Sequence, residues 1–342
     1  MGEENVQLSD FTTFKIGGLA RYFFRVKTIE EAREVFSFAR QENLPFFILG
    51  GGSNLLVSDE GFPGVIIKNE ILGISFVEEG DEFQVFAGAG ENWDSFVDHC
   101  VDKGLYGLEN LSGIPGTVGA APVQNIGAYG SEAKDTIVSV EALDSKTGKL
   151  QIFTNEECRF GYRDSFFKTA EGKRYLIANV TFRLKKGGVL NIEYKDVKSY
   201  FEAKKSFPTL KTVREAVLAI RARKFPDLAT TGTAGSFFKN PIISQIQFDA
   251  LKKKYPDLPG FVLQTANCEL PSVKVPLAWI LDNVLGIKGY MVGRVGLYNA
   301  QPLVVVNSGG ARATEVLALA KDVANKIKEK TGIEVVWEVE ML

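Results

Sequence analysis

The chain has 342 residues, of which 45% are hydrophobic and 24% are charged, with a formal net charge of −2. This length is typical of two or three domains, and the near-neutral charge disfavours broad binding to nucleic acid. The longest apolar runs, at residues 45–49 and 303–306, are far shorter than the roughly 20 residues that cross a membrane. No secretory-signal pattern is seen at the start, so we expect a cytoplasmic protein.

Helical and strand patterns alternate over the first 70 residues. The predicted elements are a helix, a strand, a turn and two further strands, at residues 30–42, 45–49, 50–54, 55–57 and 65–67. This order predicts a small α/β unit over residues 1–70.

Strands and loops dominate residues 71–225. Helices are predicted at 93–103 and 210–224, and Pro226 ends the second one. Strands are predicted at residues 83–86, 137–143, 150–153, 175–184 and 189–194.

Helical patterns return in a third region, residues 226–332. They lie at residues 246–255, 277–284 and 314–330, and Gly332 occupies a C-cap position. A final strand at 333–340 alternates and can return to the first region. One face would carry Ile333, Val335, Trp337 and Val339, and the other Glu334, Val336, Glu338 and Glu340.

Histidine and cysteine usage restricts the possible chemistry. His99 is the only histidine, so histidine-based metal sites and Ser-His-Asp catalysis are disfavoured. The three cysteines, Cys100, Cys158 and Cys268, have neither disulfide-framework nor metal-ligand spacing, which suits a reducing compartment. We therefore expect no metal.

Two glycine-rich segments are candidates for ligand binding. Residues 50–54, GGGSN, lead into a strand pattern, whereas a Rossmann loop leads into a helix. They can form an anion-binding turn for a pyrophosphate or a plain tight turn. Residues 114–130, IPGTVGAAPVQNIGAYG, indicate a rigid loop shaped to a flat or anionic ligand, or a structural loop between core elements.

Three further segments carry candidate side chains. Residues 158–168, CRFGYRDSFFK, contain cations suited to binding a carboxylate, although they can equally be ordinary surface cations. Residues 234–241, AGSFFKNP, place Ser236 beside a glycine and two aromatics, or form a simple polar turn. Residues 337–340, WEVE, carry two carboxylates that are either functional or merely solvated.

Taken together, these segments resemble the UDP-N-acetylenolpyruvoylglucosamine reductase family over nearly the whole chain, in its tyrosine-loop branch. The resemblance implies an α+β protein with a non-Rossmann FAD-binding fold of the vanillyl-alcohol oxidase type. It implies two FAD-binding domains, at residues 1–70 and 71–225, and a substrate-binding domain at residues 226–332.

The resemblance also implies the site residues. The catalytic set is Arg163, Ser236 and Glu340, with Glu338 as the alternative to Glu340. The cofactor set is Gly50, Gly51, Gly52, Ser53, Asn54, Gly116, Gln124, Asn125, Gly127, Ala128, Tyr129 and, on a weaker match, Arg221. The substrate set is Tyr194, Lys224, Asn240 and Gln301.

The resemblance implies an NADPH- and FAD-dependent reductase of peptidoglycan synthesis. FAD would pass a hydride from N5 to the enolpyruvyl group of UDP-N-acetylglucosamine-enolpyruvate, and Ser236 would supply the proton. The implied partners are the sugar nucleotide and NADPH, and the implied state is a monomer. Two alternatives stay open: another flavin oxidoreductase of the same fold acting on a hydroxy acid or sugar, and a non-catalytic nucleotide-binding protein.

Overall fold

The computed structural model describes residues 2–263 and 271–342, so Cys268 lies outside the described residues. The chain divides into two compact units. Unit 1 comprises Met1–Val6, Leu19–Gly52 and Phe62–Arg223, and unit 2 comprises Gln7–Gly18, Ser53–Gly61 and Lys224–Leu342. Each unit is thus built from segments that are distant in the sequence.

Unit 1 contains a four-stranded sheet in the order β1-β2-β5-β3, with β2 and β3 both parallel to β5. Its strands are β1 (Glu3–Gln7), β2 (Leu19–Val26), β3 (Phe46–Leu49) and β5 (Phe62–Asn69). Helix α1 (Ile29–Gln41) packs on this sheet through Ala32, Val35 and Phe36, and begins at Thr28, whose side chain accepts a hydrogen bond from Glu31 N–H.

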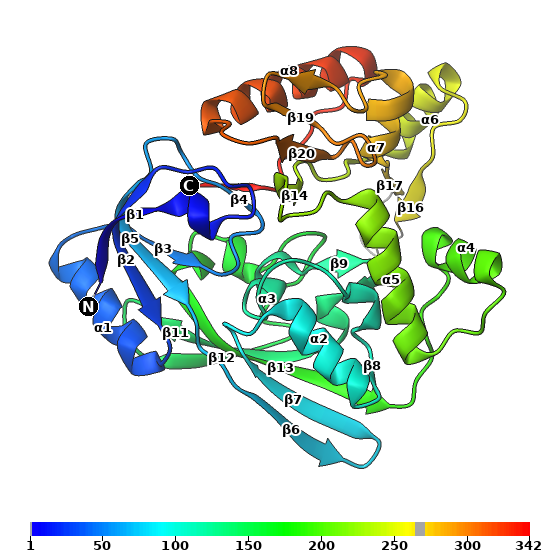
Figure 1. Ribbon diagram of the computed structural model, residues 1–342. Coiled ribbons are helices and arrows are strands. Elements are labelled where there is room, and N and C mark those ends of the chain that lie inside the picture. The colour runs from blue at the N-terminus through cyan, green and yellow to red at the C-terminus, as the bar shows by residue number, and fades with distance from the viewer. Residues whose placement is uncertain (1, 264–270) are drawn as a thin grey trace. The chain divides into compact units, whose positions relative to one another are not determined.

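A second sheet of unit 1 is antiparallel, in the order β12-β11-β13-β7-β6, with β8 paired to β13. Its strands are β6 (Ile74–Glu79), β7 (Glu82–Gly88), β8 (Leu105–Tyr106), β11 (Ile137–Asp144), β12 (Leu150–Thr154) and β13 (Tyr175–Lys186). Helix α2 (Trp93–Asp102) lies beside this sheet (Figure 1). Its Trp93 and Phe96 belong to the same hydrophobic core as Val85, Val180 and Phe182 of the sheet. The remaining α-helices and strands of unit 1 are α3 (Ala120–Gln124), β9 (Gly127–Ala128), β10 (Ser131–Glu132), α4 (Lys195–Lys204) and α5 (Leu210–Lys224), whose last residue belongs to unit 2.

Unit 2 has its own core and, in its described residues, three small sheets, ordered β14-β20-β19-β18, β15-β17-β16 and β21-β4. Its strands are β14 (Gly232–Ser236), β15 (Ile242–Ser244), β16 (Phe261–Leu263), β17 (Ser272–Lys274), β18 (Met291–Val292), β19 (Val295–Leu297) and β20 (Val304–Asn307). Its helices are α6 (Gln245–Lys254), α7 (Leu277–Trp279), which continues as a π-helix over Ile280–Val284, and α8 (Ala313–Thr331). The C-terminal strand β21 (Glu340–Met341) runs parallel to β4 (Leu55–Leu56).

Most sequence-predicted elements are confirmed, and two predicted strands are wrong. Residues 189–194 form no strand and lead into α4, a helix that was not predicted. The Asn191 backbone oxygen accepts a hydrogen bond from the Asn110 side chain and not from a neighbouring strand. The final strand is only Glu340–Met341, with an isolated bridge at Trp337. A bend at Val339 ends the alternation predicted for 333–340, and Glu338 and Val339 are both buried.

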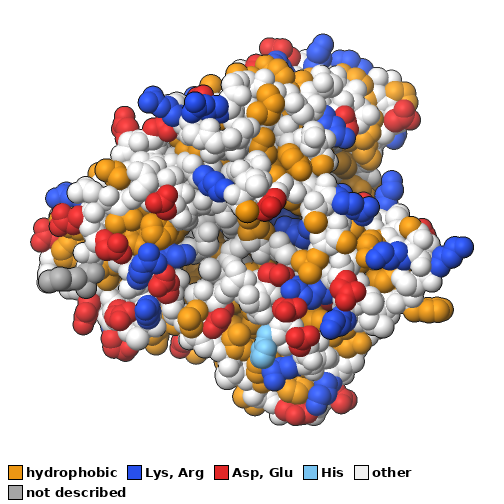
Figure 2. Space-filling model, in the orientation of Figure 1, with side chains coloured by type: hydrophobic (Ala, Val, Ile, Leu, Met, Phe, Trp, Pro, Cys, Tyr) orange, Lys and Arg blue, Asp and Glu red, His pale blue; other side chains and the backbone are white. Residues whose placement is uncertain are grey.

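Among residues 2–263 and 271–342, no helix is long and apolar enough to cross a membrane. In the same residues, no group of three or more His, Cys, Asp or Glu side chains could hold a metal ion. Acidic and basic side chains intermingle on the face shown in Figure 2.

Candidate active site

The turn after β3 lies against the loop that precedes α3, so two predicted cofactor-binding segments meet in unit 1. A Cβ built on Gly51 would lie 2.7 Å from Gly116 Cα, and one built on Gly50 would lie 2.9 Å from Thr117 Oγ1. Only glycine permits so close an approach of two backbones. Ser53 and Asn54, the other members of the predicted pyrophosphate turn, belong to unit 2.

Lys68 is a cation at this turn that the sequence analysis did not single out. Its Nζ donates a hydrogen bond to Gly50 O. Burial lowers the pKa of Lys68, as expected for an amine removed from water. In the sequence, the signal for this residue is a lysine directly after the apolar run of β5. Sequence alone cannot show that this lysine lies next to residue 50.

Residues 114–130 are more structured than the predicted loop. They contain the short helix α3 and half of the β9–β10 hairpin. Asn125 and Tyr129 have positive φ values of 44° and 48°, which is uncommon for residues other than glycine and concentrates at functional sites. Asn125 is fully buried, and its side-chain amide donates to Glu132 and to Gly161 O. These bonds hold the loop in shape, and a direct contact of Asn125 with a cofactor stays a prediction.

Arg163 lies against the predicted cofactor loop. Its Nη2 donates a 2.7 Å hydrogen bond to Gly127 O, and a Cβ on Gly127 would lie 3.1 Å from Arg163 Nη1. Arg163 itself has a φ of 52°, a strained value for a residue with a side chain. The structure thus brings a predicted catalytic residue and a predicted cofactor residue into contact.

Tyr129 connects this loop with Arg221 of α5 and with Tyr194. The Tyr129 side chain hydrogen-bonds to Arg221, and its ring meets that of Tyr194 edge-on at 5.4 Å between centroids. Burial raises the pKa of Tyr129 to about 12 and lowers the pKa of Arg221. Tyr194, the residue before α4, remains 44% exposed.

Two polar groups of unit 1, one buried and one partly buried, suit a polar ligand. Asn110 Oδ1 has no hydrogen-bond partner among the residues that the structure describes, although its Nδ2 donates to Tyr129 O and Asn191 O. Arg221 is a desolvated cation. Buried polar atoms are normally satisfied, so Asn110 Oδ1 fits a site that a ligand donor completes.

In unit 2, Ser236 is the last residue of β14, next to Gly235, which has a φ of 76°. Ser236 pairs across the sheet with Val304 after a register irregularity. The next two residues, Phe237 and Phe238, are each 1% exposed. The hydroxyl is therefore carried on backbone that is fixed on both sides.

The C-terminal glutamates lie near the same segment. Glu338 N–H donates to Phe237 O, and Glu340 N–H donates to Asn54 O. The Asn54 side chain donates to Glu338 O, so this predicted cofactor residue fixes the backbone around both glutamates. Glu338 is 9% exposed and Glu340 is partly exposed, and the choice between them stays a prediction.

Comparison with known proteins decides the family. Residues 20–154 match the family model described as FAD binding domain, and residues 227–342 match the model described as UDP-N-acetylenolpyruvoylglucosamine reductase, C-terminal domain. The UDP-N-acetylenolpyruvoylglucosamine reductase of Bdellovibrio bacteriovorus is 43% identical over 329 residues, covering 96% of each chain. The same-named protein of Chromobacterium violaceum is 41% identical, also covering 96% of each.

The chain belongs to the UDP-N-acetylenolpyruvoylglucosamine reductase family. The crystal structure of UDP-N-acetylenolpyruvylglucosamine reductase from Thermus caldophilus has 27% identity and a TM-score of 0.68, covering 100% of this chain and 98% of that chain. These matches confirm the predicted α+β, non-Rossmann FAD-binding fold with a C-terminal domain. The division of residues 1–225 into two domains stays a prediction.

Three side chains that the family resemblance assigns to substrate lie in unit 2. Asn240 Oδ1 accepts from Leu277 N–H at the start of α7. Gln301 Oε1 is buried without a hydrogen-bond partner in the described part of the chain, a condition that a ligand donor would relieve. Lys224 is the last residue of α5.

Proposed function

We propose that the protein reduces the enolpyruvyl ether of UDP-N-acetylglucosamine-enolpyruvate to UDP-N-acetylmuramate, with NADPH as reductant, in peptidoglycan synthesis. Relatives that this chain matches over almost their whole length bear the name of this reductase. The structural observation that supports the chemistry best is the contact of Arg163 with Gly127, within the predicted flavin loop.

The residues of unit 1 fit a flavin. Gly51, Gly116 and Gly127 would lie along its phosphates and ring, as glycine allows close approach of backbone to a ligand. The adjoining Ser53 and Asn54 would add polar groups beside the pyrophosphate. The other members of the proposed set are Gly50, Gly52, Gln124, Asn125, Ala128, Tyr129 and Arg221. When bound, the flavin supplies the hydride that it receives from NADPH.

Arg163 is proposed to hold the substrate carboxylate. Its guanidinium is permanently charged and binds carboxylates with two parallel hydrogen bonds. Negative charge builds up on this carboxylate as the vinyl carbon accepts hydride, so a cation placed there stabilises the transition state more than the ground state. The hydrogen bond to Gly127 O orients the cation before substrate arrives.

Ser236 is proposed to give the proton that completes the reduction, assisted by Glu340. A serine hydroxyl is a weak acid, so this role requires tight positioning beside a basic carbon. The fixed backbone on either side of Ser236 supports such positioning.

Four residues are proposed to bind the sugar nucleotide: Tyr194, Lys224, Asn240 and Gln301. Tyr194 offers an amphipathic ring, and Lys224 a charge suited to phosphate. Asn240 and Gln301 offer amide groups, and the buried Gln301 Oε1 supports a donor on the ligand. We further propose that the protein acts as a monomer in the cytoplasm, where its reductant and sugar nucleotide are made.

The test is a pair of half-reactions followed by flavin absorbance without oxygen. NADPH is expected to bleach the flavin, and added UDP-N-acetylglucosamine-enolpyruvate is expected to restore the colour with one UDP-N-acetylmuramate formed per flavin. A flavin that is bleached but not restored by this substrate would indicate another oxidoreductase of the same fold. A colourless preparation would contradict the proposal altogether.

A further inference from the structure

The first turn of α2 holds the backbone of the loop that runs from residue 111 to residue 117. Trp93 Nε1 donates to Leu111 O at 2.9 Å, and Trp93 N–H donates to Gly116 O at 3.1 Å. Asp94 Oδ1 accepts from Gly113 N–H at 2.6 Å. This loop carries Gly116, a proposed flavin contact, so the hydrogen bonds from α2 fix the backbone around that residue.

Asp94 is in turn held by Arg214 of α5, 120 residues away in the sequence. The guanidinium donates to both carboxylate oxygens of Asp94, at 2.6 and 3.0 Å, and its Nε donates to Asp98 at 2.7 Å. The side chain of Arg214 is 9% exposed, against 35% for Asp94 and 55% for Asp98. The pair with Asp94 is therefore the more buried one.

Charge accounts for the strength of this arrangement. Burial alone would raise the pKa of Asp94, but hydrogen bonds from Arg214 and from Gly113 N–H outweigh it and lower the pKa. Charge-assisted, bidentate hydrogen bonds of this kind are stronger and more directional than neutral ones. Asp94 is thus an ionised, fixed acceptor for the loop.

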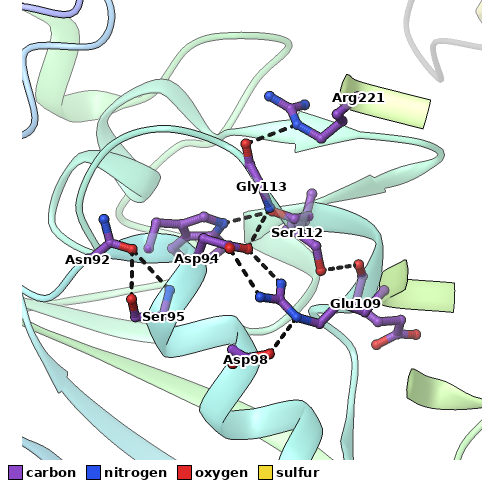
Figure 3. Close-up of polar contacts among 11 residues, drawn as sticks. Asn92, Asp94, Ser95, Asp98, Glu109, Ser112, Gly113 and Arg221 are labelled. Atoms are coloured by element: carbon purple, nitrogen blue, oxygen red, sulfur yellow. Dashed lines mark hydrogen bonds and ion pairs between the residues drawn. The ribbon is translucent and has the colours of Figure 1, made fainter. Parts of the chain in front are cut away.

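Gly113 connects Asp94 with Arg221 through two backbone hydrogen bonds. While Gly113 N–H donates to Asp94, Gly113 O accepts a 2.9 Å hydrogen bond from Arg221 Nε (Figure 3). Gly113 has a φ of 70°, and a Cβ on it would lie 2.8 Å from Leu218 and 3.2 Å from Arg221. Gly113 N–H and Gly113 O belong to the two peptide groups that flank its Cα, and the close contacts with Leu218 and Arg221 restrict the residue. The backbone conformation at Gly113 therefore helps to place the Arg221 guanidinium.

We propose that Asp94, held by Arg214, is a positioning residue for flavin binding. It fixes the backbone at Gly113 and, through this backbone, the position of the Arg221 guanidinium. This inference rests on the proposed function, since the flavin is the ligand that the loop and Arg221 hold. Asp94 touches neither substrate nor cofactor in this proposal. It acts through the backbone at Gly113, which its hydrogen bond holds in place.

The test measures how fast FAD leaves the holoenzyme, by the rise of flavin fluorescence after dilution. Asp94→Asn keeps the size of the side chain but removes the charge, and we expect release about 10- to 100-fold faster, by analogy with residues that orient metal ligands. If Asp94→Asn does not fold, the second variant is Arg214→Lys, which loses the paired guanidinium hydrogen bonds to Asp94. Asp98→Asn is the matched control, because it removes a carboxylate from the same arginine without touching Gly113, and we expect a change below about twofold, as for exposed pairs.

A double-mutant cycle separates positioning from general destabilisation. If Asp94 acts through Arg221, Asp94→Asn should change release by less than about threefold in an Arg221→Lys background. Release that is unchanged in Asp94→Asn, equal in Asp94→Asn and Asp98→Asn, or additive with Arg221→Lys would overturn the inference. A wild-type holoenzyme that keeps FAD but does not reduce the enolpyruvyl substrate would instead contradict the proposed function alone.

Discussion

Gly51 provides the sharpest test of the proposed flavin site. Replacing it with alanine adds a Cβ that would lie 2.7 Å from Gly116 Cα, 3.2 Å from Gly116 C and 3.5 Å from Gly116 N, all backbone atoms. Ordinary carbon–carbon contact begins at about 3.5 Å, so the two segments must separate by about 0.8 Å. Gly51 does not have a positive φ, so the effect comes from the lack of space and not from backbone strain.

The expected magnitude follows from the cost of overpacking. An inserted methyl group in a well-packed site costs about 1–3 kcal/mol, and every 1.4 kcal/mol changes affinity about tenfold. If the strain is relieved by displacing the turn from the loop at residue 116, FAD affinity should fall by about 5- to 150-fold.

The assay is titration of FAD-free protein with FAD, followed by quenching of flavin fluorescence, together with thermal unfolding with and without FAD. Gly161→Ala is the control, since its Cβ would meet only Asp164 Cβ at 3.6 Å. The reasoning fails if Gly51→Ala binds FAD within about twofold of wild type. It also fails if both variants lose the same affinity.

Three further predictions concern catalysis and pH. Ser236→Ala should leave flavin reduction by NADPH unchanged but slow the step with enolpyruvyl substrate by about 100- to 10,000-fold, the usual range for general acid catalysis; equal loss in both half-reactions by stopped flow would contradict this. In the same assay Glu340→Gln should slow only the second half-reaction, whereas Glu338→Gln should mainly lower the unfolding temperature, and the reverse result would exchange their roles. Burial raises the pKa of both Cys100 and Cys158 from 9 to about 12. The unfolded chain therefore loses these protons first, and stability should fall between about pH 9 and 12 with a slope of up to about 1.4 kcal/mol per pH unit for each thiol. Cys100→Ala should flatten that slope in urea unfolding, and an unchanged slope would refute the assignment.

The sequence alone determined the features that depend on local pattern. Helix α5 has the predicted bounds, Leu210–Lys224, because a 3.6-residue apolar period and a following proline are both local signals. The turn after β3 and the αL cap at Gly332 (φ 69°) were predictable for the same reason. The family motifs also predicted the cofactor and the reaction.

Tertiary structure decided which distant groups meet. The predicted strand at 189–194 is absent, and the backbone oxygen of Asn191 accepts a hydrogen bond from Asn110, about 80 residues earlier. The pairing of Asp94 with Arg214 across 120 residues, and the position of Lys68 at the Gly50 turn, have no local signature. Hydrogen bonds and charge pairs act over a few ångströms in space, so the sequence identifies the groups that can form them and only the folded chain selects their partners.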